Sequence, residues 1–230
     1  MLPFKQDDDH STQATSTELV WYAAYGSNMH LDRLTCYLAG GVPPGGAHRN
    51  PGCRDPRPPR RTEAVVLPGR LYFAGESGVW TGGMAFHDPL APDETPGRAY
   101  LLSAEQFSDL AAQEMRHPPG RDLDLRTVLA TGRDQFGPGR YETLLCPGHL
   151  DGIPVLTLTA PSPATPLNAP AAGYLRHLAA GLHDAHGWSP ARSADYLATR
   201  PGAAGTWTAP TVLEALHVPH AAPPPGVAAE

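Results

Sequence analysis

The sequence predicts an α+β fold in which a small, mostly antiparallel β-barrel is flanked by helices. Three observations predict this fold. Short apolar runs separated by glycine and proline turns follow one another between 64 and 102, as consecutive antiparallel strands do. Two further runs, at 142–146 and 153–159, are typical of a hairpin that would close the barrel. Helical spacing and capping residues then mark three C-terminal helices, at 172–186, 190–199 and 210–216.

The chain's first ordered feature is a junction between a strand and a helix. The run 19–25 is apolar and aromatic, which predicts a buried strand, and Gly26 then frees the backbone for a turn. Ser27 or Asn28 is the expected N-cap of a helix with apolar positions at helical spacing: Leu31, Leu34 and Leu38. Unpaired N–H groups and the helix dipole would favour a carboxylate here. The alternative is an ordinary capped turn.

The predicted strands after the junction are 64–67, 70–74, 79–86 and 98–102. The third contains Trp80 and the pair Gly82 and Gly83, and glycines within a strand usually mark a bulge or a close backbone approach. Two interpretations stay open for this pair: it faces a ligand, or it only curls the sheet.

A helix is expected to begin at Ala104, because Ser103 and Gln106 form a capping-box signature. One stripe of this helix carries three apolar residues and a carboxylate: Phe107, Leu110, Ala111 and Glu114. Glu105 and Asp109 are expected on the opposite, solvated face. Partial burial would raise the pKa of Glu114. If the helix instead ends one turn earlier, Glu114 emerges into water.

Four segments together resemble the γ-glutamylcyclotransferase-like superfamily. They are the opening motif Tyr25-Gly26-Ser27-Asn28-Met29, the segment Trp80-Thr81-Gly82-Gly83, the helix end 110–114 with its Gln-Glu pair, and a helix start at Tyr174. The resemblance covers about 20–35, 64–115 and 140–198.

The resemblance implies an enzyme that needs no cofactor, an amide-cleaving cyclising transferase or lyase. It would release 5-oxoproline from a γ-glutamyl amide, with Glu114 as general acid/base. The implied substrate-binding residues are Tyr25, Gly26, Ser27, Asn28, Met29, Trp80, Gly82, Gly83 and Tyr174. Two alternatives remain: a non-catalytic γ-glutamyl-like small-molecule binding module, and an enzyme that removes a γ-glutamyl group from a larger amine.

Composition limits the partners. A net charge of -6 and a pI near 6.0 argue against nucleic acid or an anionic membrane, so a small-molecule γ-glutamyl substrate is the expected partner. Three cysteines (Cys36, Cys53 and Cys146) without a Cys-x-x-Cys pair suit a reducing cytoplasm. His183 and His186 could share a helix face with a metal, but no third ligand is spaced to join them, so no metal is expected. The sequence gives no oligomeric state.

The chain is expected to be one domain at 18–216 between a flexible tail, 1–17, and a disordered tail, 217–230. Two insertions interrupt the domain, at about 40–62 and 116–140. The first is rich in arginine and proline and is expected to be a surface insertion, with a basic binding patch as the alternative. The second is either a lid over the site or a surface excursion.

Overall fold

The computed structural model describes residues 18–43, 48–78, 80–163 and 166–217. The predicted tail 1–17 lies outside these residues, and so does the predicted tail 217–230 except for His217, which ends the last helix. In the described part of the chain, no helix is long and apolar enough to cross a membrane.

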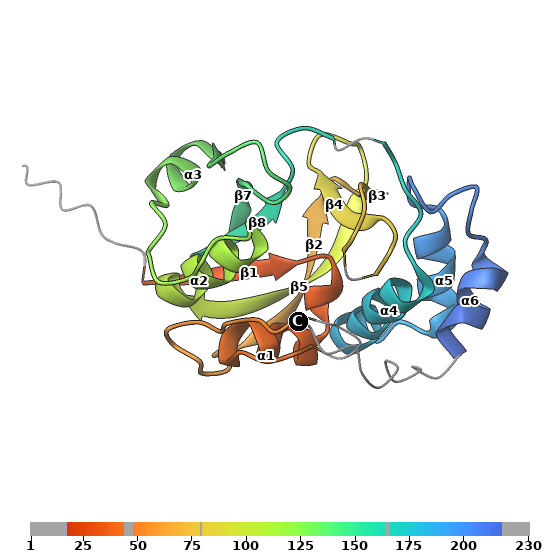
Figure 1. Cartoon of the computed structure of the whole chain (residues 1–230). Helices are drawn as coiled ribbons and strands as arrows, with labels where there is room; N and C mark the ends of the chain where they lie inside the picture. Colours follow the sequence, from red (N-terminus) through yellow and green to blue (C-terminus); the bar gives the residue numbers. More distant parts are fainter. Residues whose placement is uncertain (1–17, 44–47, 79, 164–165, 218–230) are drawn as a thin grey trace, which may run out of the picture.

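The centre of the fold is a six-stranded mixed sheet with the order β2-β5-β1-β8-β7-β6 (Figure 1). The first strand in sequence, β1, lies inside it, antiparallel to β5 and parallel to β8. Every other neighbouring pair is antiparallel. The strands are β1 (Leu19–Ala24), β2 (Thr62–Pro68), β5 (Glu94–Ser103), β6 (Arg133–Gln135), β7 (Thr143–Leu150) and β8 (Ile153–Thr159).

The α+β class is confirmed, but the predicted barrel is wrong: no closed barrel forms among the described residues. β3 (Arg70–Ala74) and β4 (Met84–Asp88) pair only with each other, and they form a separate two-stranded sheet. β2 pairs with β5 rather than with β3, its neighbour in sequence. The described edge strands β2 and β6 are therefore not joined to each other, and the large sheet stays open.

The predicted strand 79–86 is also shifted. Its first residue, Val79, lies outside the described residues, and 80–83 form a turn before β4 begins at Met84. The N–H of Ser77 donates to the carbonyl of Gly82 at 2.8 Å, and the N–H of Gly83 donates to Ala169 at 2.8 Å. These bonds take the backbone groups that a strand would have used for its ladder.

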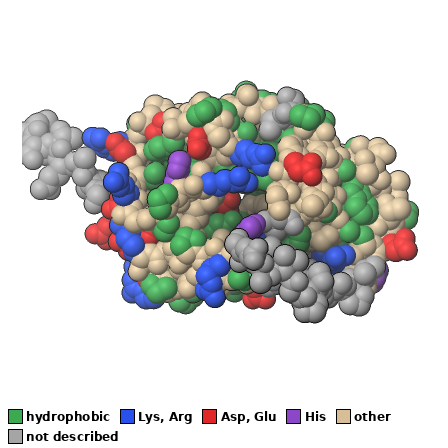
Figure 2. Space-filling view, viewed as in Figure 1, with side chains coloured by type: hydrophobic (Ala, Val, Ile, Leu, Met, Phe, Trp, Pro, Cys, Tyr) green, Lys and Arg blue, Asp and Glu red, His purple; other side chains and the backbone are tan. Residues whose placement is uncertain are grey.

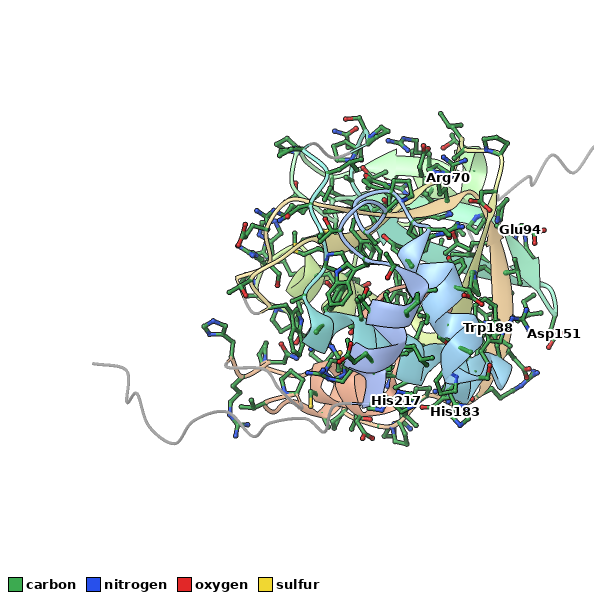
Figure 3. The ribbon with its side chains drawn as sticks, turned by 90° about the vertical axis from the view of Figure 1, so that its right-hand side faces the viewer. Arg70, Glu94, Asp151, His183, Trp188 and His217 are labelled. Atoms are coloured by element: carbon green, nitrogen blue, oxygen red, sulfur yellow. The ribbon has the colours of Figure 1, made fainter. Side chains whose placement is uncertain are left out.

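Helices pack on the large sheet at several places. α2 (Ala104–Glu114) lies against β1 and β5, and α1 (Leu31–Ala39) packs on α2. The C-terminal helices α4 (Ala172–His186), α5 (Pro190–Ala198) and α6 (Ala209–His217) pack on one another, and α4 also touches β5 and β2. Figure 3 looks onto this group, with α5 and α6 in front and His183 and His217 at its lower end. α3 (Arg126–Thr131) lies near β6 and β7.

The junction after β1 differs from the expected capped helix. Ser27 and Asn28 are not N-caps, because Ser27–Met29 forms a short 3-10 helix, η1, and His30 is the N-cap of α1. The N–H of Met29 donates to the carbonyl of Gly26 at 3.0 Å, which closes the turn. The hydroxyl of Tyr100 donates to the carbonyls of Asn28 and Met29, both at 2.8 Å. The buried side chain of Tyr100 therefore holds η1 in place.

The capping box of α2 is present as predicted, with the side chains of Ser103 and Gln106 each bonded to the other's backbone N–H. Asp109, however, is not on a solvated face. Its side chain is fully buried and accepts bonds from the backbone N–H groups of Arg54 at 2.8 Å and Gly120 at 2.8 Å. The Arg54 guanidinium also pairs with it at 2.9 Å. Asp109 thus ties both predicted insertions to α2.

Candidate active site

A cavity of about 740 Å³ opens between the end of β1, the end of α2 and the start of α4. Figure 2 shows a hollow on this face with basic side chains along its upper edge. The lining comes from segments far apart in sequence and includes Tyr22, Tyr25, Gly26, Ser27, Asn28, Arg33, Tyr37, Trp80, Ala85, Glu114, Arg116, Arg140, Tyr141 and Tyr174.

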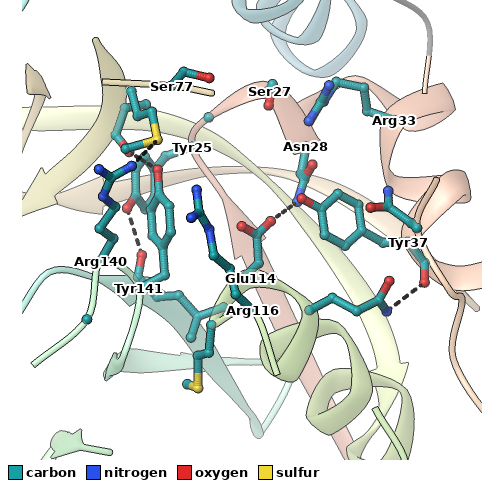
Figure 4. A pocket seen from close by; sticks show the side chains of 18 of the residues that line it. Tyr25, Ser27, Asn28, Arg33, Tyr37, Ser77, Glu114, Arg116, Arg140 and Tyr141 are labelled. Atoms are coloured by element: carbon teal, nitrogen blue, oxygen red, sulfur yellow. Dashed lines mark hydrogen bonds between the residues drawn. The ribbon is translucent and has the colours of Figure 1, made fainter. Parts of the chain in front are cut away.

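Glu114 is the last residue of α2, and its carboxylate faces this cavity (Figure 4). The Asn28 amide donates to its Oε1 at 2.7 Å. Burial raises the pKa of Glu114 above the usual glutamate value, while the charge of Arg33 and hydrogen bonds from Asn28 and Tyr37 oppose the rise. No ion pair to Glu114 forms within the described ranges. The helix does not end early, and the carboxylate stays among protein groups rather than in bulk water.

The turn at 26–28 forms the wall beside Glu114. A side chain at Gly26 would bring its Cβ to 3.3 Å from the Tyr174 hydroxyl, so the chain passes that hydroxyl closely. The same hydroxyl accepts the backbone N–H of Ala85 at 3.2 Å. Over the described part of the chain, the N–H groups of Ser27 and Asn28 have no hydrogen-bond partner. This wall therefore offers backbone donors to whatever occupies the cavity.

Tyr25 shapes the cavity instead of offering it a donor, because its hydroxyl donates to the Leu158 carbonyl at 2.7 Å. Trp80 and Tyr174 lie side by side in the wall, with ring centroids 6.2 Å apart. Seven of the predicted site residues line the cavity together: Tyr25, Gly26, Ser27, Asn28, Trp80, Glu114 and Tyr174.

Three predicted site residues do not line the cavity. Met29 is buried beneath it, where it packs on Gly181 of α4. Gly82 and Gly83 face the segment before α4: a Cβ on Gly82 would lie 2.8 Å from the Ala169 carbonyl oxygen, and one on Gly83 would overlap the Asn168 carbonyl. The predicted close backbone approach is present, but the neighbour of the two glycines is the segment before α4 and not the cavity.

Sequence reasoning missed Arg33, Tyr37, Arg140 and Tyr141. Arg33 and Tyr37 lie four residues apart on α1, so they share a face beside the stripe of leucines. That spacing was the available signal. Arg116 and Arg140 are the first and last residues of the second insertion, and Tyr141 follows it. Both ends of 116–140 therefore reach the cavity, while its middle forms α3 and β6.

The two histidines considered for a metal are engaged elsewhere. His183 contacts the carbonyl of Trp188 at 3.1 Å, and His186 contacts that of Gly97 at 2.8 Å. Among the described residues, no group of three or more His, Cys, Asp or Glu side chains could hold a metal ion.

Comparison with known proteins gives few relatives. No family model matches the chain. A curated relative, "Histone deacetylase 5" of Arabidopsis thaliana, is 36% identical over 183 residues, which covers 71% of this chain and 28% of that protein. The chain thus spans less than a third of that relative's length.

Two solved structures align with 86% of this chain and 98% of their own, each at 15% identity. One is a γ-glutamyl cyclotransferase, with a TM-score of 0.48, and the other is an uncharacterized protein from Homo sapiens, with a TM-score of 0.47. The first carries the name of the superfamily that the sequence motifs resemble. At these scores neither carries an argument about activity, which has to come from the site itself.

Proposed function

We propose that this chain is a γ-glutamylcyclotransferase-type enzyme that releases 5-oxoproline from a γ-glutamyl amide. The observation that carries the proposal is the Glu114 carboxylate, held by Asn28 at 2.7 Å in a cavity whose surroundings raise its pKa. A carboxyl group with a raised pKa can accept a proton and return it near neutral pH. The motif resemblance supports the same reaction.

In the proposed reaction the substrate brings its own nucleophile. The α-amine nitrogen attacks the γ-carbonyl carbon, a new C–N bond closes the five-membered ring, and the original amide C–N bond breaks. Glu114 takes a proton from the attacking amine and gives it to the departing amine nitrogen. Because the attack is intramolecular, the protein's main task is to hold the glutamyl chain in a folded geometry.

The free N–H groups of Ser27 and Asn28 are the proposed donors to the γ-carbonyl oxygen as it gains negative charge. The Tyr174 hydroxyl borders the same turn and is proposed to complete this wall. Trp80 would pack against the aliphatic part of the substrate. No cofactor has a role in this scheme, since every proton and bond is supplied by substrate and protein.

The alternative is a module that binds a γ-glutamyl-like molecule without turnover. The cavity suits both functions, but a binding module has no need for an acid with a raised pKa next to backbone donors. The deacetylase activity named for the plant relative is not proposed for this chain, because the match spans 28% of that protein.

The test is 5-oxoproline release from a panel of γ-glutamyl amino acids, glutathione and γ-glutamyl amines, with the natural chain and Glu114→Gln. The substitution is expected to lower kcat by about 10²–10⁴, the range of general acid–base catalysis. Glu105→Gln is the matched control, because Glu105 lies on the same helix with its side chain 45% exposed.

Two results decide the proposal. Release that Glu114→Gln removes and Glu105→Gln leaves unchanged supports the cyclotransferase. A natural chain that binds a panel member and releases no 5-oxoproline from any overturns it in favour of the binding module.

A further inference from the structure

Arg33 lies in the cavity wall and has hydrogen-bond donors without partners. It lies on α1, is 8% exposed and contributes to the cavity lining. Its Nε and Nη1 are buried without a hydrogen-bond partner, and within the described residues no carboxylate pairs with it. Its guanidinium carbon lies 5.6 Å from the centre of the Trp80 ring. The tryptophan contacts the guanidinium but satisfies none of its N–H groups.

A buried guanidinium whose N–H groups have no acceptor is costly, since a charged donor removed from water needs hydrogen-bonding partners. Seven other arginines of the described chain have a carboxylate partner. Those in ion pairs are Arg54, Arg57, Arg61, Arg70, Arg98, Arg126 and Arg200. The donors of Arg33 instead stay unpaired in a cavity wall, which is the arrangement expected of an anion-binding group.

A second unpaired atom lies in the same wall. Asn28 gives its Nδ2 to Glu114 at 2.7 Å, which leaves its Oδ1 buried and without a partner. The orientation of this amide follows from its neighbour, because the carboxylate needs a donor. One wall therefore carries unused donors on Arg33 and an unused acceptor on Asn28. An α-amino acid head group, with a carboxylate and an amine on one carbon, complements both.

We propose that Arg33 holds the α-carboxylate of the γ-glutamyl group while Asn28 Oδ1 accepts from its α-amine. This rests on the proposed function and assigns the glutamyl end of the substrate to this wall. The amine then lies beside the hydrogen-bonded pair of Asn28 and Glu114, which Figure 4 shows, and the turn at Ser27 is left for the γ-carbonyl oxygen. Arg33 is a positioning residue for the attack.

A carboxylate is favoured over other anions by the geometry of the group. The planar guanidinium can donate two parallel N–H bonds, a match for two carboxylate oxygens. The nearby Glu114 carboxylate would repel a more highly charged anion such as phosphate, but it suits a head group that also brings an amine.

The test compares two amides of one amine: a γ-L-glutamyl amide, and the 4-aminobutanoyl amide, which differs only in lacking the α-carboxylate. The natural chain is expected to prefer the glutamyl amide in kcat/KM by about tenfold to a hundredfold, the worth of hydrogen bonds to a charged group. Arg33→Met is expected to lose this preference, and Arg33→Lys to keep part of it. Loss of packing alone would slow both amides alike and leave their ratio unchanged.

The matched control is Arg192→Met. Arg192 also lies over a tryptophan, 4.1 Å from the centre of the Trp188 ring, but on α5 and outside the cavity lining. It is expected to leave the ratio as it is. If Arg33→Met does not fold, the comparison is made with Arg33→Lys. Lysine keeps the positive charge and removes only the planar guanidinium that can donate two parallel hydrogen bonds.

Binding separates this inference from the proposed function. Calorimetric titration of the Glu114→Gln protein with both amides needs no turnover. If this protein binds the glutamyl amide more tightly, and the difference disappears when Arg33 is also replaced, the inference is supported even if no 5-oxoproline is ever released. The inference is overturned if Arg33→Met, or Arg33→Lys in its place, keeps the full preference for the carboxylate-bearing amide.

Discussion

The Asn28 amide donates to the carboxylate of Glu114 at 2.7 Å, and so joins the turn after the first strand to the end of α2. The same Nδ2 lies 3.3 Å from the Tyr22 hydroxyl. Asn28 thus fixes the orientation of the carboxylate, whose protonation the proposed reaction depends on. Two of the four segments that resemble the cyclotransferases meet through this one bond.

Asn28→Ala is expected to raise the pKa of Glu114, because the hydrogen bond that lowers it is lost. Since the attacking amine needs an ionised base, the acidic limb of kcat/KM should move to higher pH, and kcat should fall about tenfold as the carboxylate loses its orientation. A pH–rate profile measures both. Thr35→Ala, an exposed change on α1, is the control, and an unmoved acidic limb in Asn28→Ala would contradict the expectation.

Glu114→Gln is expected to stabilise the folded protein at neutral pH. Burial raises the folded pKa of Glu114 above 4.5, so the stability this group contributes is complete below about pH 4.5 and is lost as pH rises through the folded pKa. Glutamine never ionises and can still accept from Asn28. Thermal unfolding should therefore give a higher Tm for the variant at pH 7.5 and a smaller difference near pH 4.5. A lower Tm at pH 7.5 would disprove this.

Gly83→Ala is expected to destabilise the fold by about 1–3 kcal/mol or more, because its Cβ would overlap the Asn168 carbonyl and the backbone would have to move. The N–H of Gly83 also donates to Ala169 at 2.8 Å, so the two segments cannot separate freely. Urea unfolding measures the change. Gly78→Ala is the matched control, since its Cβ would meet nothing within 4 Å, and equal stability of the two variants would falsify the packing role.

Asp109→Ala is expected to cost about 2–4 kcal/mol, since it leaves the N–H groups of Arg54 and Gly120 without their acceptor in a buried place. In the natural chain these partners lower the pKa of Asp109 in the folded state, against the effect of burial. The stability that Asp109 contributes is therefore present above pH 3.8 and lost as pH falls through the folded pKa. Urea unfolding checks the cost. Asp124→Ala, which removes an exposed pair with Arg126, should leave the unfolding midpoint unchanged.

Local signals in the sequence predicted the starts of two helices correctly. The capping box at Ser103 gave the start of α2, and Pro190 after Ser189 gave the start of α5, because a helix start is determined by residues within one turn. The apolar stripe that carries Glu114 was also readable, and it led to the residue on which the proposed function depends. Its partner Asn28 was predicted as a site residue through the motif resemblance.

Features that depend on distant contacts were predicted less well. The barrel was wrong because strand order depends on which strands pair, and β1 joins β8 across more than 130 positions. Asp109 was assigned to solvent because nothing near it in sequence shows that Arg54 would cover it. Arg33 was missed for a similar reason: its role depends on a cavity wall that α1 shares with Trp80.

The central position of β1 constrains how the chain can be made. Both neighbours of β1 in the sheet, β5 and β8, follow it in the chain, and the second of these ends at Thr159. Until β8 has been made, one edge of the apolar strand Leu19–Ala24 has no partner, and unpaired strand edges of this kind promote aggregation. Folding must therefore wait for most of the domain, and synthesis rate and chaperone supply should affect the yield of folded protein more than the stability of any one helix does.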